Sequence, residues 1–212
     1  MSDICLDGGL PSNCGLPDSS SNFDAGAVCP ESGRGTFVDE RDGQEYKYTT
    51  IGNQVWMAQN LNYETYYSML HEKEYKDCAE CGRWYNLEIN LPNRDVMDSV
   101  CPAGWKVPTI EDWNILFTTI GNVSTALRVL LSESWEFVQS TNVCGFNGIE
   151  ASTIRKNKDE FVFLNGNTGW CTQTVISPEN VLKVFFGQEA RTRTVVELKS
   201  IKLKITTSLS AA

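Results

Sequence analysis

The sequence predicts an α+β fold, with antiparallel strands on both sides of a central helical segment. Short β-branched and aromatic runs, separated by Gly and Asn pairs, follow residue 36 and return after residue 140, which is typical of strands. An amphipathic helical pattern lies between them, and the chain lacks the regular strand and helix alternation of a parallel sheet. With 212 residues, of which 41% are hydrophobic, the chain is long enough to bury a substantial core.

The N-terminal segment differs in composition from the rest of the chain. Residues 1–35 are rich in Gly, Ser, Pro, Asp and Asn, and their apolar residues show no period, which is typical of an arm or linker. Cys5, Cys14 and Cys29 offer covalent ties, so the arm is either stapled to the body or closed by an internal disulfide. The predicted division is therefore an arm, residues 1–35, and one domain, residues 36–212.

Two turn signals divide the first strands. Asp42-Gly43 and Gly52-Asn53 separate short β-branched and aromatic runs, as turn residues do between antiparallel strands. We expect residues 47–51 and 54–57 to form a hairpin, with both central residues of the second pair at positive φ.

The stretch "IGNQVWMAQNLNY", residues 51–63, is predicted to be scaffold. Trp56 and Leu61 should anchor the core. Asn60 and Asn62 should hold neighbouring loop backbone by hydrogen bonds.

The clearest helix is "PTIEDWNILFTTIG", residues 108–121. Its apolar stripe consists of Trp113, Leu116, Phe117 and Ile120. Thr109 is the predicted N-cap, Asp112 can complete a capping box, and Gly121 ends the helix. A second, shorter helix is predicted over residues 124–131.

Strand patterns return after residue 140. The segments "EFVFLNGNTGW", "VLKVFFG" and "SIKLKITTSL" are separated by Gly and Asn clusters, and no helix is expected among them. In the last segment Ile201, Leu203 and Ile205 alternate with lysines. This alternation predicts one strand whose lysines protect a sheet edge.

Composition narrows the classes of partner and compartment. A formal net charge of −9 and a pI near 4.7 argue against nucleic acid, because phosphate binding needs clustered Lys and Arg. Eight cysteines beside a single histidine, His71, fit an oxidising compartment. No apolar run reaches the ~20 residues that span a bilayer. The start "MSDICLDGGL" lacks the features of a secretory signal, so a chain with its signal removed and a chain without one both stay open.

Six stretches of sequence carry a family resemblance. In chain order they are "DGQEY", "IGNQVWMAQNLNY", "CGRWYN", "CPAGWKVPT", "CGFNG" and "NTGWCTQT". Taken together, they resemble the Fibrobacter succinogenes major paralogous domain, a family of bacterial secreted and surface-attached proteins. The resemblance covers about residues 36–175, and the ordered series is more specific than any single stretch.

The resemblance implies a fold similar to C-type lectins and formylglycine-generating enzymes. In that fold a "LPT…EW" motif starts a helix, and Val107-Pro108-Thr109 and Asp112-Trp113 stand at those places. The implied architecture has antiparallel strands, two helices and long loops. The implied role is adhesion or ligand display, outside a bacterial cell or on its surface.

Two departures from the family concern the cysteines. The family commonly closes with a Gly-Phe-Ser-Val-Arg-Cys strand, whereas residues 200–205 are Ser-Ile-Lys-Leu-Lys-Ile, so the usual partner of Cys101 is missing. Cys81 and Cys171 stand where aromatic residues are commoner in the family. The resemblance therefore implies a locally different set of disulfides.

The pair Cys78 and Cys81 has a spacing that permits a redox disulfide, half of a zinc site or two structural disulfides. Its context looks like a loop leading into a strand, which disfavours a redox motif. Zinc would need further ligands such as Cys101 or Cys144. Structural disulfides are favoured, and Cys144 with Cys171 is the first predicted pairing because each lies beside a strand in the second half of the chain.

Signals for catalysis are weak. His71 lies in the charged segment "LHEKEYKD", typical of a solvated side chain, and no Gly-x-Ser-x-Gly elbow occurs. The acid pairs Glu111-Asp112 and Asp159-Glu160 are adjacent in sequence, so their carboxylates point in different directions, unlike those of a glycosidase.

Signals for the metal chemistry of related folds are also weak. The Glu-Pro-Asn and Trp-Asn-Asp motifs of a lectin calcium site are absent, and "SPEN" at 177–180 is only distantly similar. A formylglycine-generating enzyme needs reactive cysteines near the end of the domain, and none follows Cys171. We therefore expect no catalytic residue, no metal and no cofactor.

Loops in the second half are the predicted contact surface. "NGNTG" and "SPEN" place small amides and a carboxylate on turns, where a rigid scaffold commonly presents recognition residues. The predicted ligand-binding residues are Asn165, Asn167, Glu179 and Asn180, with ordinary turn residues as the alternative. Trp170 is assigned to the core.

The sequence thus predicts a non-catalytic, secreted or cell-surface binding or adhesion module, which recognises an extracellular glycan or protein through loops of a lectin-like scaffold. Two alternatives stay open. One is a structural or assembly subunit of a surface complex, and the other is a cysteine- or metal-dependent enzyme.

Overall fold

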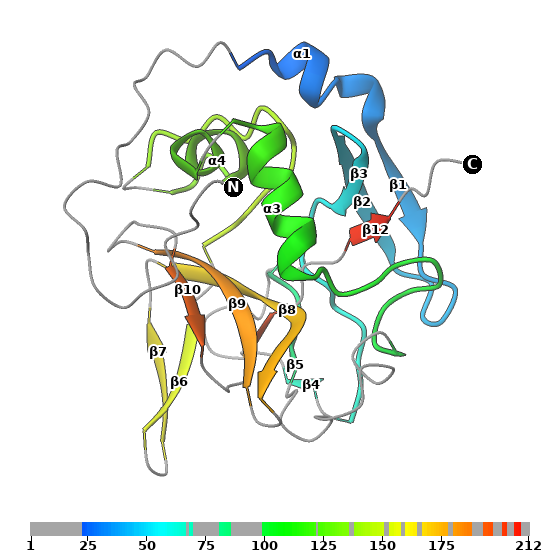
Figure 1. The fold of residues 1–212 in the computed structure, drawn as a ribbon. Helices are drawn as coiled ribbons and strands as arrows, with labels where there is room; N and C mark the ends of the chain where they lie inside the picture. Colours follow the sequence, from blue (N-terminus) through cyan, green and yellow to red (C-terminus); the bar gives the residue numbers. More distant parts are fainter. Residues whose placement is uncertain are drawn as a thin grey trace, which may run out of the picture.

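The structure is a computed structural model that describes thirteen parts of the chain. These are residues 23–66, 68–69, 81–85, 99–121, 123–135, 138–150, 153–157, 160–164, 167–177, 180–187, 193–196, 201–202 and 206–208. They form helices and mainly antiparallel strands (Figure 1). The predicted α+β class is therefore confirmed.

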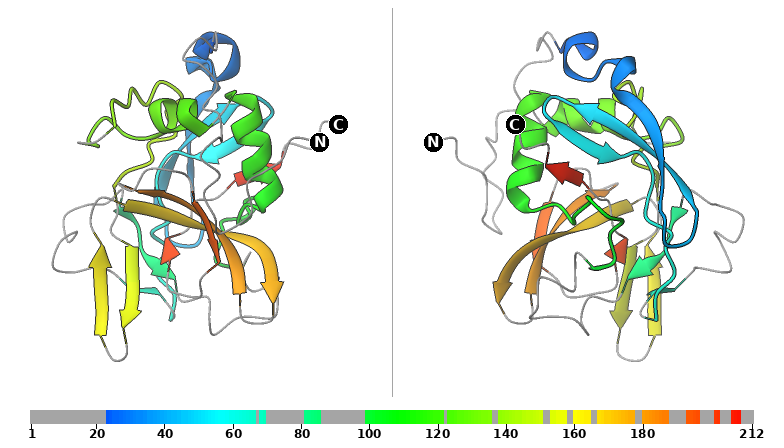
Figure 2. Two further views of the ribbon diagram at one scale, coloured as in Figure 1. Left: turned by 60° about the vertical axis from the view of Figure 1, so that its left-hand side comes forward. Right: turned by 90° about the vertical axis from the view of Figure 1, so that its right-hand side faces the viewer.

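A four-stranded sheet joins the two ends of the domain. Its order is β1-β2-β3-β12, with the strands β1 (Arg34–Val38), β2 (Glu45–Ile51), β3 (Gln54–Met57) and β12 (Thr206–Ser208). All three pairings are antiparallel. Because β12 pairs with β3, the last described strand joins the sheet of the first three (Figures 1 and 2).

The predicted hairpin of residues 47–57 is confirmed as β2 and β3, with Ile51 opposite Gln54. Gly52 has a φ of 56°, but Asn53 does not share the positive φ that we expected. The expectation for Asn53 is wrong because a two-residue turn of type II′ needs positive φ only at its first central residue.

A second sheet contains six strands. Its order is β10-β9-β8-β11-β5-β4, with the strands β4 (Ser68–Met69), β5 (Trp84–Tyr85), β8 (Asn167–Ser177), β9 (Asn180–Gly187), β10 (Arg193–Val196) and β11 (Ile201–Lys202). A separate ribbon consists of β6 (Thr153–Asn157) and β7 (Glu160–Leu164). In Figures 1 and 2 this ribbon extends at the end of the molecule opposite the N-terminal helix.

The single strand predicted over residues 200–209 is wrong in two respects. The segment supplies two strands to different sheets, and β11 lies between β8 and β5 and not at an edge. Alternation of apolar and charged residues fixes the two faces of a strand, but it does not fix which sheet the strand joins. Leu203 and Ile205 lie outside the described residues.

Three α-helices fall within the described residues. They are α1 (Ala25–Val28), α3 (Ile110–Thr119) and α4 (Val123–Leu130), and a 3-10 turn covers Glu31–Gly33. The predicted N-cap and capping box are confirmed, since the Thr109 side chain accepts from the Asp112 N–H and the Asp112 carboxylate accepts from the Thr109 N–H. The predicted second helix is confirmed within one residue at each end.

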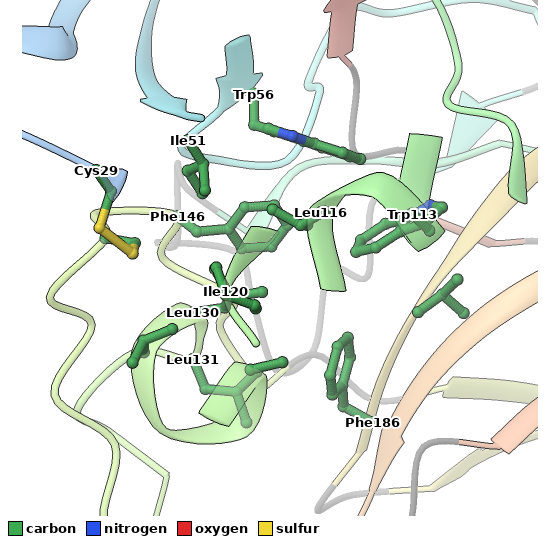
Figure 3. Close-up of a cluster of buried hydrophobic side chains, with 14 of the residues drawn as sticks. Cys29, Ile51, Trp56, Trp113, Leu116, Ile120, Leu130, Leu131, Phe146 and Phe186 are labelled. Atoms are coloured by element: carbon green, nitrogen blue, oxygen red, sulfur yellow. A yellow bond between two sulfur atoms is a disulfide. The ribbon is translucent and has the colours of Figure 1, made fainter. Parts of the chain in front are cut away.

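The core lies where α3 meets both sheets (Figure 3). Trp113 of α3 contacts Trp56 of β3, with ring centroids 4.8 Å apart, and Trp170 of β8, at 5.6 Å. All three indoles are fully buried, so the assignments of Trp56 and Trp170 to the core are confirmed. Leu61 is also buried, in a second cluster with Tyr46.

One disulfide ties the predicted arm to the domain. Cys29, which follows α1, bonds to Cys144 across a sequence separation of 115 residues. The predicted Cys144–Cys171 pairing is therefore wrong. Cys144 belongs to the core cluster that contains Cys29, whereas Cys171 belongs to the second cluster, with Tyr46. The first strand begins at Arg34, and the boundary after residue 35 stays a prediction.

Candidate functional site

The structure separates two of the predicted ligand-binding residues. Asn167 opens β8 and pairs with Gly187, whereas Asn180 opens β9 and pairs with Ser177. They therefore lie at opposite ends of one antiparallel ribbon, roughly 30 Å apart at the usual rise of a strand. Together they cannot bind one small ligand, although each stays a predicted contact.

The other two, Asn165 and Glu179, lie outside the described residues, as do His71 and Cys78. Cys81 is disulfide-bonded, so its sulfur is not a thiolate that could serve zinc. Over the part of the chain that the structure describes, no three His, Cys, Asp or Glu side chains gather in a way that could hold a metal ion. In the same part, none of the helices combines the length and the apolar surface needed to cross a membrane.

The turn between β1 and β2 contains a buried carboxylate with a fixed arginine. Asp39 is only 1% exposed. It accepts from the Arg41 backbone N–H at 3.1 Å, from Nε at 2.8 Å and from Nη2 at 2.6 Å. The Asp39 carbonyl also accepts from the Gly43 N–H, and its own N–H donates to the Gln44 carbonyl. Side chain and backbone thus hold the turn together.

The two charges of this pair shift each other's titration. Hydrogen bonds from Arg41 lower the pKa of Asp39, although burial of the carboxylate acts in the opposite direction. The hydrogen bond to Asp39 likewise raises the pKa of Arg41. Both groups are therefore charged throughout the neutral range.

Arg41 also contacts two other segments. Its guanidinium lies over the Tyr63 ring, 3.8 Å from the centroid, and Nη1 donates to the Ser99 carbonyl at 3.4 Å. The side chain is 26% exposed. Bonds to Asp39 and Ser99 use one N–H on each nitrogen, so two of the five guanidinium N–H groups have no partner among the described residues.

A stack of aromatic rings includes residues from both strands that flank this turn. Phe37 stacks on Tyr46 at 5.6 Å and on Trp105 at 4.5 Å, with interplanar angles of 25° and 24°. Tyr46 is fully buried, whereas Phe37 and Trp105 are half-buried. Burial raises the pKa of Tyr46 to about 12, and its hydroxyl accepts from the Asn62 N–H at 3.0 Å. A buried tyrosine thus fixes the inner end of the stack.

Two amides complete the surface. The Asn62 Nδ2 donates to the Gln44 Oε1 at 3.3 Å, and both side chains are half-buried. We name the whole surface the turn patch, and its members are Phe37, Arg41, Gln44, Asn62, Tyr63 and Trp105. In Figure 1 the β1–β2 turn lies beside the green segment that leads into α3, which supplies Trp105.

Sequence analysis missed the turn patch. It predicts that residues 51–63 are scaffold, and this holds for Asn60, whose Nδ2 donates to the Cys81 carbonyl at 3.1 Å. For Asn62 the predicted bond to loop backbone is wrong, because its amide bonds the Gln44 side chain. The one available signal was the Asp-x-Arg spacing of Asp39 and Arg41 in a turn.

Comparison with known families gives a match. The family model of the Fibrobacter succinogenes major domain matches residues 49–205. No curated protein and no solved structure matches the chain.

Proposed function

Because the chain belongs to the Fibrobacter succinogenes major domain family, we propose that it is a secreted or cell-surface binding module of a bacterium. In this proposal it recognises a glycan or a protein, serves adhesion or ligand display, and catalyses no reaction. The family match itself names a domain and no activity, so the proposal rests on the chemistry of the surface.

One observation carries the proposal, namely the fixed geometry of the turn patch. Buried Tyr46 supports Phe37, Phe37 supports Trp105, and buried Asp39 holds Arg41. Arginine and aromatic side chains contribute most of the affinity in many recognition surfaces. Side chains that are already immobile lose little entropy when a ligand binds. A half-buried, preordered surface of this composition therefore favours recognition.

We also propose that the α+β fold is of the C-type lectin kind. Two features support this proposal. The N-terminal and C-terminal strands of the domain share one sheet, and Val107-Pro108-Thr109 leads into the capped helix α3 as the family resemblance implies. An experimental structure that superposes on lectin domains over both sheets and both long helices would test this assignment.

The disulfides support the proposed location outside the cell. Cys29 bonds to Cys144, and Cys81 is also disulfide-bonded. Such bonds persist in oxidising compartments and are rare in a reducing cytosol. Fractionation of the native cells, with the protein detected by antibody, should find it in the medium or at the surface.

The ends of the β8–β9 ribbon supply further proposed contacts. Asn167 belongs to one end and Asn180 to the other, while Asn165 and Glu179, which lie outside the described residues, stay predicted contacts. Because the two ends lie roughly 30 Å apart along the strands, they would touch different parts of an extended or macromolecular ligand.

The test is direct binding by the whole chain. Labelled protein is applied to a glycan array and to intact cells, and Trp105→Ala is compared with Ile115→Ala, which removes an exposed apolar side chain from α3. We expect saturable binding that is lost in the first variant and kept in the second. Binding that Trp105→Ala leaves unchanged would refute a role for the turn patch.

Two further measurements address the alternatives. Light scattering that shows ordered oligomers, with no binding to glycans or cells, would favour a structural subunit. Metal analysis with thiol titration tests the enzyme alternative, since a stoichiometric metal or a reactive thiol would support it.

A further inference from the structure

We propose that the turn patch binds a neutral polysaccharide, and that it does so without calcium. This inference rests on the proposed function and deepens it by naming the ligand class. Three properties of the patch lead to it: the outermost aromatic ring, the set of hydrogen-bonding groups, and the charge around them.

The aromatic ring at the outside of the stack is Trp105. Phe37 supports it at 4.5 Å and nearly parallel, and Phe37 in turn lies on buried Tyr46. A pyranose ring presents a flat array of C–H groups close to the size of an aromatic ring. A fixed, half-buried indole offers such a face apolar contact at low entropic cost.

The polar groups of the patch match hydroxyl groups. The bond between Asn62 and Gln44 leaves Gln44 Nε2 and Asn62 Oδ1 without a partner among the described residues. Arg41 adds two N–H donors on the same side chain that covers Tyr63. A hydroxyl both donates and accepts, so the amide oxygen and these N–H groups can bind hydroxyls of a polysaccharide.

The surrounding charge disfavours an acidic ligand. Asp39 neutralises Arg41, while Glu40, Asp42 and Glu45 are exposed on the turn and the start of β2. Lys47 is the exposed cation farther along β2. Excess carboxylates repel uronic acids and sulfated sugars at short range.

The same chemistry makes calcium unnecessary. Calcium binds through six to eight oxygen ligands, whereas the groups that the patch offers are mostly N–H donors. Arg41 and Gln44 Nε2 donate to sugar oxygens directly, so no cation is needed to bridge them, and no three His, Cys, Asp or Glu side chains in the described part of the chain gather to hold one. Recognition should therefore persist in a chelator.

Affinity electrophoresis tests the proposal with the full chain. Native gels contain hydroxyethyl cellulose, glucomannan, arabinoxylan or, as the acidic probe, polygalacturonate, each with EDTA. We expect at least one neutral polymer to retard the protein and polygalacturonate not to do so. Trp105→Ala should weaken the retarding interaction at least about tenfold, Trp105→Phe less, and Gln44→Ala about threefold to tenfold.

Ile115→Ala is the matched control, since it removes an apolar side chain of 43% exposure from α3. Thermal unfolding of each variant verifies that it is folded, and Gln44→Ala removes only one side-chain hydrogen bond at the patch. Because Gln44→Ala should fold, loss of binding in that variant reports on the patch.

Three outcomes would overturn the proposal: no neutral polymer retards the protein, only polygalacturonate does, or retardation needs calcium. Retardation that is equal in Trp105→Ala, Gln44→Ala and wild type would overturn it as well. If labelled protein still binds cells through Trp105 while no polysaccharide retards it, this inference fails and the proposed function survives.

Discussion

Asp39 shows how one residue fixes a surface that lies mostly on other segments. Its carboxylate is almost fully buried, and burial alone would be unfavourable for the charged form. Hydrogen bonds from three N–H groups of Arg41 compensate for this, and they place the guanidinium over Tyr63. The position of the arginine therefore depends on the ionisation of one aspartate.

This dependence predicts how the free energy of unfolding changes at acidic pH. The pKa of Asp39 is lower in the folded protein than its ordinary value of 3.8. The pair therefore contributes its full stabilisation above the unfolded pKa and loses it as the pH falls through the folded pKa. Asp39→Asn should lower the free energy of unfolding by about 1–3 kcal/mol at pH 7 and by much less near pH 2.

Urea unfolding at pH 7, 4 and 2 measures the difference between wild type and variant. Glu40→Gln is the control, because it removes a neighbouring exposed carboxylate. A difference for Asp39→Asn that stays constant down to pH 2 would contradict the assigned coupling.

At the same scale, the candidate site shows the limit of sequence reasoning. Trp56, Asn60 and Trp170 were assigned correctly, because burial of an aromatic or a loop amide follows from local pattern. Phe37 and Trp105 are far apart in sequence and look like two ordinary core residues. Only the fold brings them into one stack, so no local pattern could identify the turn patch.

Among the elements, the β2–β3 turn is tightly constrained by its surroundings. Gly52 has positive φ, and a Cβ there would lie 2.6 Å from the Thr119 Cγ2 at the end of α3. The stability of a variant at Gly52 therefore depends on the contact between the first sheet and α3.

Gly52→Ala should be more destabilising than Gly43→Ala. Gly43 also has positive φ, but nothing lies within 4 Å of the position that a Cβ would take there. The cost at Gly43 should be about 1–2 kcal/mol from backbone strain alone, and at Gly52 about 2–4 kcal/mol with the clash included. Adding Thr119→Ser to Gly52→Ala should recover part of that excess. Equal losses in the two glycine variants, measured by urea unfolding, would contradict the clash.

The N-terminus of α3 gives a second test for an element. The Asp112 carboxylate accepts from the Thr109 N–H at 2.7 Å and from the Lys106 Nζ at 2.9 Å. Asp112→Ala should lower the free energy of unfolding by about 1–2 kcal/mol, because it removes half of the capping box. Glu111→Ala removes a neighbouring exposed carboxylate from the same turn and should stay near wild type in the same assay. Similar losses in both variants would indicate a general charge effect.

Elements that are determined by nearby residues could be predicted from the sequence. Elements that depend on pairing between distant segments could not. Thr109, Gly121 and the apolar stripe bound α3 within a few residues, and Gly52 sets the hairpin. The division of the last segment between two sheets depends on Trp56 and Trp170, with which β12 and β11 pair. Contacts across that distance leave no trace in the local pattern.

For the whole molecule, the disulfide and a hydrogen bond from β2 act on the same region. Cys29 and Cys144 connect the N-terminal segment to the loop after α4, and the Thr49 Oγ1 donates to the Cys144 carbonyl at 2.6 Å. This hydrogen bond therefore links β2 to the loop after α4, which also carries the disulfide. Both cysteines are buried.

Removal of this disulfide should destabilise the whole molecule. A link across 115 residues restricts the unfolded chain enough to contribute about 4–5 kcal/mol in the loop-entropy account. Cys29→Ala combined with Cys144→Ala should therefore lower the free energy of unfolding by about 2–5 kcal/mol, since measured values often fall short of that account.

Urea unfolding under non-reducing conditions compares the double variant with wild type, and each single variant should match the double one, because either removes the link. The denatured chain without the link is more expanded, so the m-value should rise or stay equal. A loss below about 1 kcal/mol would mean that the noncovalent contacts of Cys144 already hold this region. In that case the loop after α4 should keep its amide protection in the double variant, because the Thr49 hydrogen bond and the surrounding core would position it without the covalent bond.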